Sequence, residues 1–214
     1  MKDIPVRKGR RHILGLVALG EHEQQDFKFL ISDARKIARS ISAFANHSGG
    51  CLLIGVKDNG TVAGVRNEED IYVVEQAAER YCHPPQHVEF EAYSVDTGVV
   101  VIKAVIAPAQ KRPVSVIEQD GSRHVYYRVN DENISAHPLM VRSWLESRKG
   151  TLLTFSDTET MALHLLADGC TSAQGLATGL HCSQSVADDI IVRLAAAGVI
   201  KFVYTGDAFT IACV

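Results

Sequence analysis

The residues best suited to binding phosphate stand at the start of the chain. Residues 1–12 contain five lysines and arginines against one aspartate, whereas residues 151–214 contain two against six acidic residues. Contacts from lysine and arginine to phosphate supply most of the sequence-independent affinity of a protein for nucleic acid. We therefore predict a basic N-terminal arm over residues 1–14 that binds nucleic acid, with a disordered solubilising end as the alternative interpretation. The candidate contacts are Arg7, Lys8, Arg10 and Arg11, together with Lys28 further along the chain.

Two other patterns fall short of the chemistry that they could indicate. The segment 82–87 holds one cysteine and two histidines, but a structural zinc site closes with four ligands and the segment offers no fourth. A P-loop places lysine and then serine or threonine directly after the second glycine of GxxxxG. Here Gly50 and Gly55 are followed by Val56, and residues 52–54 between the glycines have the composition of a buried strand. We predict neither a zinc site nor a P-loop site for ATP.

The overall composition bounds the class of protein. With 46% hydrophobic and 22% charged residues, the 214-residue chain is typical of globular proteins and is long enough for two modest domains. The longest apolar run, residues 98–107, is too short to span a bilayer, and the N-terminus lacks the apolar stretch of a signal peptide. The five cysteines are scattered and without a CxxC pair, which is typical of reduced thiols. We expect a cytoplasmic protein with no membrane partner.

Residues 15–150 are predicted to form an α+β domain with a mixed sheet. A strand over 26–31 leads into an amphipathic helix over 33–45, with Ser32 as its N-cap and Asn46 as a capping residue at its end. A strand over 51–57, the Asp58-Asn59-Gly60 turn and a return strand over 61–65 predict a hairpin. The domain is completed by a helix over 68–80, strand pairs at 88–94 with 99–106 and 114–117 with 124–129, and a closing helix over 139–147.

Residues 151–214 are predicted to form a small winged helix-turn-helix domain. Helices over 157–167, 171–180 and 183–197 precede a two-stranded wing at 199–204 and 208–213, which is the element order of that fold. The helix that would enter a DNA groove, 183–197, offers Asp188 and Asp189 but only Arg193 to a polyanion. Winged helices without basic residues serve as interaction modules, so the acidity of this domain favours contact with protein.

Three segments of the first domain carry a more specific pattern. They are the acidic stretch from Glu21 to Lys28, the sequence AFANHSGG at 43–50, and IGVKDNG at 54–60; Arg112-Pro113 and Tyr127-Arg128-Val129 follow further on. Over about residues 15–148 the chain resembles the Schlafen AlbA-type domain family. In that family a winged helix often follows this domain, and such proteins are described as transcriptional regulators or as divergent ATP-binding proteins.

The resemblance also implies a catalytic alternative. Related Schlafen proteins cleave RNA with a divalent metal held by three carboxylates, and the matching positions here are Glu21, Asp26 and Asp58. Carboxylate oxygens are the ligands that Mg²⁺ and Mn²⁺ prefer. Two observations oppose this assignment: an offset of five places Glu21 and Asp26 on opposite faces of a straight strand, and a DNG turn accounts for Asp58 without any metal.

Three functions therefore stay open. The favoured one is a nucleic-acid-associated protein, in particular a DNA-binding transcriptional regulator. The second is a ribonuclease that depends on Mg²⁺ or Mn²⁺, and the third is a non-catalytic module for dimerisation and protein contact. Because Schlafen proteins contain two AlbA-type lobes and this chain has one, the resemblance also implies a homodimer.

Overall fold

The computed structural model describes residues 4–66, 69–150 and 154–214. The chain forms two compact units, described separately below: unit 1 extends to Gln110 and includes Val114–Ser135, and unit 2 comprises Lys111–Pro113 and Ala136–Val214. The helix predicted over 139–147 therefore belongs to unit 2, which begins at Ala136, whereas the sequence predicts the domain boundary at residue 150. In the described residues no helix is long and apolar enough to cross a membrane.

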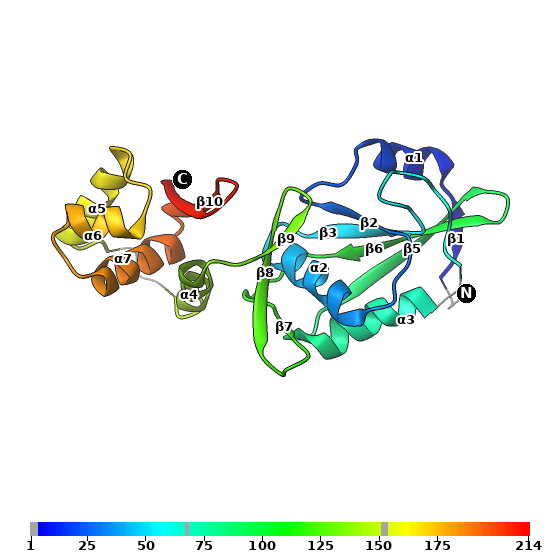
Figure 1. The fold of residues 1–214 in the computed structure, drawn as a ribbon, viewed down its shortest axis with the longest axis horizontal. Coiled ribbons are helices and arrows are strands. Elements are labelled where there is room, and N and C mark those ends of the chain that lie inside the picture. Colours follow the sequence, from blue (N-terminus) through cyan, green and yellow to red (C-terminus); the bar gives the residue numbers. More distant parts are fainter. Residues whose placement is uncertain (1–3, 67–68, 151–153) are drawn as a thin grey trace. The chain divides into compact units, whose positions relative to one another are not determined.

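Unit 1 is built on a five-stranded mixed sheet, which confirms the predicted α+β class (Figure 1). In spatial order the strands are β1 (Val6–Lys8), β5 (Val88–Asp96), β6 (Val99–Ile106), β3 (Gly50–Ile54) and β2 (Gln25–Lys28). β1 pairs parallel to β5, β2 pairs parallel to β3, and β6 runs antiparallel to both of its neighbours, β5 and β3. The C-terminal ends of β1, β2, β3 and β5 consequently lie at one end of the sheet, which we call the carboxyl end.

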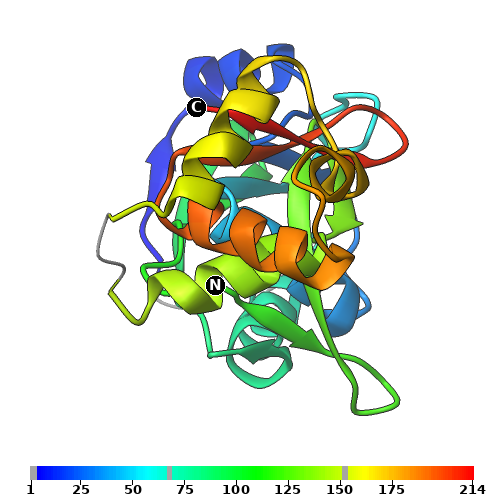
Figure 2. The same cartoon turned by 90° about the vertical axis from the view of Figure 1, so that its left-hand side faces the viewer.

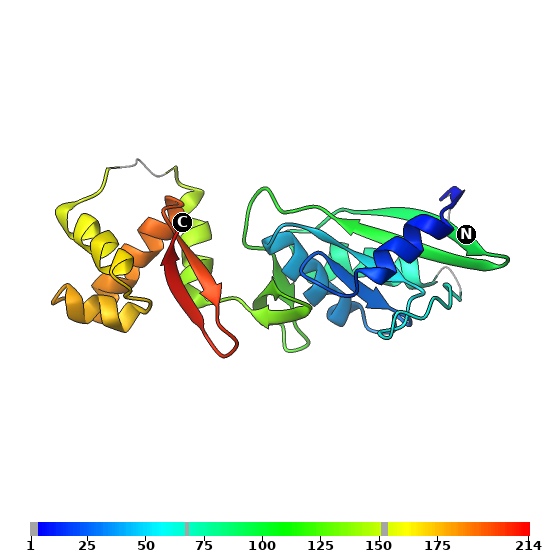
Figure 3. The same cartoon turned by 90° about the horizontal axis from the view of Figure 1, so that it is seen from above.

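Helices cover both faces of this sheet. On one face α2 (Ala34–Asn46) and α3 (Glu69–Gln76), which continues as a π-helical turn over Ala77–Tyr81, bury the inward residues of the sheet in the larger core. On the other face α1 (Arg10–Ala18) lies across the strands (Figure 3) and packs with its inward residue Ile13 on Phe27, Leu53 and Val101. The residues of the sheet alternate between these two cores because successive side chains of a strand point to opposite faces.

Residues 6–18 form part of this fold, which corrects the prediction of an arm over residues 1–14; residues 1–3 of that prediction lie outside the described part of the chain. β1 extends the sheet through its pairing with β5, and Ile13 of α1 is fully buried. The Gln25 side chain also donates to the Leu16 and Gly20 carbonyls at the end of α1, at 2.8 and 2.7 Å. The prediction of an arm rests on the four cations of residues 7–11, whereas the apolar residues Ile13, Leu16 and Val17 pack α1 into the core.

A smaller four-stranded sheet packs beside α2 and is bound by Asn46, the last residue of the AFAN motif. Its strands, in spatial order, are β4 (Cys82–His83), β7 (Ser115–Ile117), β8 (Arg123–Val129) and β9 (Glu132–Ser135). Asn46, fully buried, donates to the carbonyls of Val114 and Tyr126 at 2.8 and 2.9 Å and accepts from the Val114 amide at 2.7 Å. Asn46 therefore joins α2 to the smaller sheet, whereas the sequence predicts it as a capping residue at the end of the helix.

Two local predictions differ from the structure. The N-cap of α2 is Asp33, whose carboxylate accepts from the amides of Arg35 and Lys36, and Ser32 makes no such bond in the described structure. The predicted hairpin after β3 is reduced to a single bridge between Val56 and Val62 around a tight turn. The strand pairs at residues 88–106 and 115–129 lie where the sequence placed them.

The described residues of unit 2 form four helices and a hairpin. The helices are α4 (Pro138–Ser147), α5 (Asp157–Ala167), α6 (Ala173–Gly179) and α7 (Gln184–Ala196), and the hairpin pairs β10 (Ile200–Tyr204) with β11 (Phe209–Cys213) (Figure 2). Ser156 and Glu159 form a capping box at the start of α5, which accounts for the position predicted for that helix. α7 occupies the centre of the core and contributes buried residues such as Ile191 and Leu194.

Candidate nucleic-acid interface

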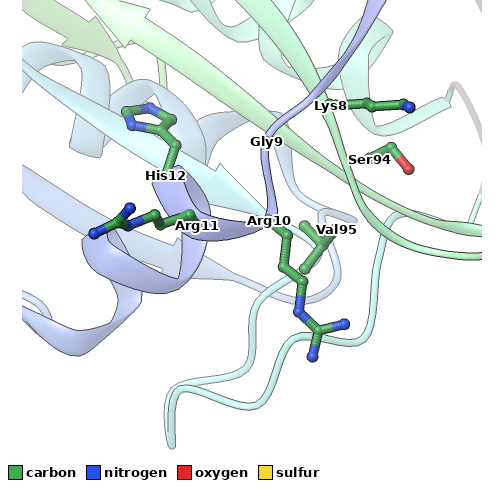
Figure 4. Close-up of a pocket in the computed structure, with 7 residues that line it drawn as sticks. All are labelled: Lys8, Gly9, Arg10, Arg11, His12, Ser94 and Val95. Carbon is green, nitrogen blue, oxygen red and sulfur yellow. The ribbon is translucent and has the colours of Figure 1, made fainter.

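The junction between β1 and α1 forms a basic hollow on unit 1. A hollow of ≈ 690 Å³ is lined by Lys8, Gly9, Arg10, Arg11 and His12 from this junction and by Ser94 and Val95 from β5 (Figure 4). The side chains of Lys8, Arg10 and Arg11 are exposed and point away from one another. This splayed arrangement suits a polymer with several phosphates better than it suits a single small anion.

The backbone of the junction is held firmly while its charges stay accessible. Gly9 donates to the Ser94 carbonyl at 3.0 Å, and a Cβ at Gly9 would lie 2.3 Å from the Tyr93 ring, so only glycine fits this close approach. The first turn of α1 contains no acidic residue and its N-cap provides no side-chain hydrogen bond. The positive end of the helix dipole therefore adds to the charge of the arginines. Arg10 forms an exposed ion pair with Asp96 at 3.1 Å, and Arg7 is exposed on β1.

Lys28 differs from the other basic candidates because it is tied into unit 1. Its ammonium lies 2.7 Å from the Asp26 carboxylate and donates to the Phe27 carbonyl at 2.9 Å. Asp26 is only 5% exposed, and the Arg128 guanidinium approaches its other oxygen at 3.7 Å. Lys28 thus serves first as the counter-charge of a buried carboxylate.

Glu21 and Asp26, two of the three predicted carboxylates, meet in the structure. A tight turn closes between His22 and Gln25 through reciprocal backbone hydrogen bonds of 3.0 and 3.1 Å, which brings Glu21 back beside β2. Glu21 accepts from the Phe27 amide at 2.8 Å. Burial, followed by a hydrogen bond with Asp26, raises the pKa of Glu21. The bend that a five-residue offset requires is therefore this turn.

Asp58, the third predicted carboxylate, lies elsewhere. The parallel register pairs Asp26 with Leu52, whereas β3 ends at Ile54 and the chain then turns before it reaches Val56. Asp58 is exposed in the turn beyond Val56, at the carboxyl end of the sheet. Within the described ranges no group of three or more His, Cys, Asp or Glu residues is arranged to hold a metal ion.

The arrangement of these carboxylates does not fit the divalent metal that the family resemblance implies. Asp26 already has Lys28 and Arg128 as counter-charges, Glu21 accepts a backbone hydrogen bond, and Asp58 is separated from both. A divalent cation requires several uncommitted anionic oxygens around one point. We therefore derive no metal-dependent step from this site.

The cysteine and histidines of residues 82–87 have a structural setting. Cys82 is 2% exposed and its thiol lies 3.7 Å from the Ala38 carbonyl, in a hydrogen bond that it donates. Burial raises the pKa of Cys82 to about 12, which keeps the thiol protonated and disfavours metal ligation. His83 and His87 are exposed.

Arg128 is the residue of this region whose role the sequence did not reveal. Its side chain is 1% exposed and donates to the carbonyls of His22 and Gln25, at 3.3 and 3.2 Å, and to Asn133 at 2.9 Å. Its guanidinium carbon also lies 4.9 Å from the centroid of the Phe44 ring. Desolvation lowers the pKa of Arg128, while the charge of Asp26 opposes that shift. Arg128, which lies on β8, therefore anchors the turn that follows Glu21. An arginine at an inward position of a strand is the signal that could have indicated a buried partner.

The family relationship follows from the first unit. The family model described as Schlafen, AlbA_2 matches residues 21–137, more than half of the chain. The chain belongs to this family. The matched region contains the Glu21 turn, the Asn46 junction and Arg128, while β1 and α1 precede it.

Solved structures show weaker likeness to the chain. The DIP2311 protein from Corynebacterium diphtheriae is 16% identical with a TM-score of 0.43, and the match covers 88% of this chain and 34% of that one, so the chain spans about a third of its length. The N-terminal domain of a RecG-related protein from Nitrosomonas europaea is 18% identical with a TM-score of 0.42, over 62% of this chain and 94% of that domain. A comparison of the sequence with curated proteins finds no match.

Proposed function

We propose that the protein binds nucleic acid through unit 1, and that it acts as a regulator of the Schlafen AlbA type in which unit 2 supplies contacts to protein. The observation that carries this proposal is the basic hollow at the β1–α1 junction, where Lys8, Arg10 and Arg11 stand exposed around a helix N-terminus. Exposed cations on a rigid backbone supply the electrostatic contacts that dominate binding to a phosphate backbone.

The electrostatics of unit 2 support its assignment to protein contact. We assign it as a winged helix-turn-helix, from three helices followed by a hairpin, with α7 in the position of the recognition helix. Arg193, the one basic residue of α7, pairs with Glu159 at 3.0 Å, and Glu159 is only 2% exposed. Arg142 of α4 forms an ion pair with Asp189 of α7. Arg193 and Arg142 are therefore both paired with carboxylates of unit 2, and α7 also carries Asp188.

The proposal includes a homodimer, because a single AlbA-type unit offers one basic surface and a two-fold pair offers two. Light scattering at tens of micromolar, an ordinary range for dimer affinities, is expected to give twice the chain mass. A monomer under these conditions would remove the dimer from the proposal and leave nucleic-acid binding to be tested separately.

The direct test of binding compares the full chain with a charge-reduced variant. Fluorescence anisotropy with labelled DNA and RNA oligonucleotides should show binding by the wild type and a loss of about tenfold or more in the triple variant Lys8→Gln, Arg10→Gln, Arg11→Gln. Arg123→Gln is the matched control, since Arg123 is an exposed arginine of β8 in the smaller sheet. Equal affinity of the triple variant and the wild type would exclude the β1–α1 surface as the binding site.

A further inference from the structure

A second cationic cluster lies at the carboxyl end of the sheet. The ring of Phe29, the residue directly after β2, has the Lys57 ammonium and the Arg66 guanidinium carbon each at 5.1 Å from its centroid. Phe29 is half-buried, while Lys57 and Arg66 are exposed. We call these three residues the Phe29 cluster. In the described residues neither Lys57 nor Arg66 has a carboxylate within ion-pair distance.

The topology brings this cluster to the same end of the sheet as the basic hollow. Lys57 follows β3 and Phe29 follows β2, while Lys8 ends β1, and these three strands share one direction. In open α/β sheets, ligands bind beyond the carboxyl ends of the strands. Segments far apart in the sequence therefore place their cations at one end of unit 1.

Packing contacts and hydrogen bonds link the segments that carry the two clusters. A Cβ at Gly60 would lie 3.3 Å from Val17 Cγ1, so the turn that carries Lys57 packs against α1 (Figure 1). The Val65 amide donates to the Val100 carbonyl at 2.8 Å, which places Arg66 near the start of β6. Arg10 pairs with Asp96, the last residue of β5, directly before the β5–β6 turn. Both clusters thus flank the β5–β6 turn.

The separation of the clusters sets the size of the ligand. β3 and β2 are three and four strand positions from β1, which corresponds to about 14 to 19 Å. No single phosphate reaches both clusters. An aromatic ring with adjacent cations, combined with a basic surface that follows a backbone, is the combination by which proteins bind single-stranded nucleic acid.

We propose that the Phe29 cluster and the basic hollow form one binding track for single-stranded nucleic acid across the carboxyl end of unit 1. This inference rests on the proposed function and specifies its ligand. Lys8, Arg10 and Arg11 contact phosphates at one end of the track, Lys57 and Arg66 contact phosphates at the other, and a base stacks on Phe29. The track also carries the acidic side chains of Asp58 and Asp96; Arg10 balances Asp96, while Asp58 stands next to Lys57 and weakens its pull on phosphate.

The test uses the full chain and labelled single strands of roughly 16 nucleotides, the upper site size of common single-strand binding folds. Lys57→Gln with Arg66→Gln should weaken binding about tenfold, and Phe29→Leu should weaken it about fivefold or more. Arg123→Gln should bind like the wild type, and a blunt duplex of the same sequence should bind more weakly than the single strand. Circular dichroism of each variant verifies that the fold is retained.

The outcomes separate this inference from the proposed function. If the Phe29-cluster variants bind like the wild type while the Lys8, Arg10, Arg11 variant loses affinity, the track is wrong and the proposed function stands. Tighter binding of the duplex than of the single strand would also overturn the track. If the wild type binds no oligonucleotide, both proposals fail.

Discussion

Replacing Asn46 should destabilise unit 1 by an amount that follows from its hydrogen bonds. Asn46→Ala leaves the buried Val114 amide without its 2.7 Å acceptor and removes the 2.9 Å donor to the Tyr126 carbonyl, whereas the Val114 carbonyl keeps a 2.8 Å bond from Ser42. An unsatisfied buried amide costs about 1–3 kcal/mol and an ordinary lost hydrogen bond about 1 kcal/mol. We therefore expect the free energy of unfolding to fall by about 3 kcal/mol.

Urea denaturation followed by far-ultraviolet circular dichroism measures this change, and the fluorescence of the single tryptophan, Trp144, reports on unit 2. Asn46→Asp should be worse than Asn46→Ala, because a carboxylate oxygen would face the two carbonyls that the amide now bonds. Lys36→Ala, an exposed change on the same helix, should stay within about 0.5 kcal/mol of the wild type. A loss below about 1 kcal/mol for Asn46→Ala would refute the assigned role.

Three further predictions address charge. Asp58→Asn should tighten oligonucleotide binding severalfold in the anisotropy assay, because it removes a negative charge beside Lys57 while Asn suits the turn equally well; weaker binding would indicate that Asp58 contacts the ligand directly or through a metal. Glu21→Gln should flatten the pH dependence of stability. Because the pKa of Glu21 is raised in the folded protein, its contribution to the free energy of unfolding is fully present below the unfolded-state pKa of 4.5 and is lost as pH rises through the folded-state pKa. Thermal melts from about pH 4 to 7 measure this effect. If the melting temperature of the variant depends on pH as steeply as that of the wild type, the prediction is wrong. Arg193→Gln should lower the free energy of unfolding of unit 2 by about 1 kcal/mol, because Arg193 forms an ion pair with the buried Glu159, and it should leave oligonucleotide affinity unchanged. A large loss of affinity would show that α7 contacts nucleic acid.

Periodic sequence signals predicted most of the secondary structure. The apolar stripe of α2, the capping box of α5 and the strand pair at residues 88–106 each rest on neighbours within a few residues, so local pattern was sufficient. The structure of the N-terminal segment differs from the prediction because the pairing partner of β1, strand β5, lies over eighty residues away and the cations of residues 7–11 are its most prominent local signal. Local composition cannot report a contact whose energy comes from a distant strand.

The site shows the same division. The structure brings Glu21 and Asp26 of the family motif together. The counter-charge Lys28 lies two residues from Asp26 on the same strand, whereas the counter-charge Arg128 comes from β8, over a hundred residues away. Asp58 shares the motif with them, yet it lies in the exposed turn beyond β3, and within the described residues it joins no group of three or more His, Cys, Asp or Glu that could hold a metal ion. The Phe29 cluster was invisible in the sequence because its members come from three separate segments and each alone is an ordinary surface residue.

The salt dependence of nucleic-acid binding tests the central claim most directly. Five cations of the track, Lys8, Arg10, Arg11, Lys57 and Arg66, imply a slope of log Kobs against log salt concentration of about −3.5 for a single strand, at about −0.7 per neutralised phosphate. Replacing the first three by glutamine should reduce the magnitude of that slope to about 1.4, since two contacts remain. A wild-type slope near zero, or one that the triple variant leaves unchanged, would contradict the account.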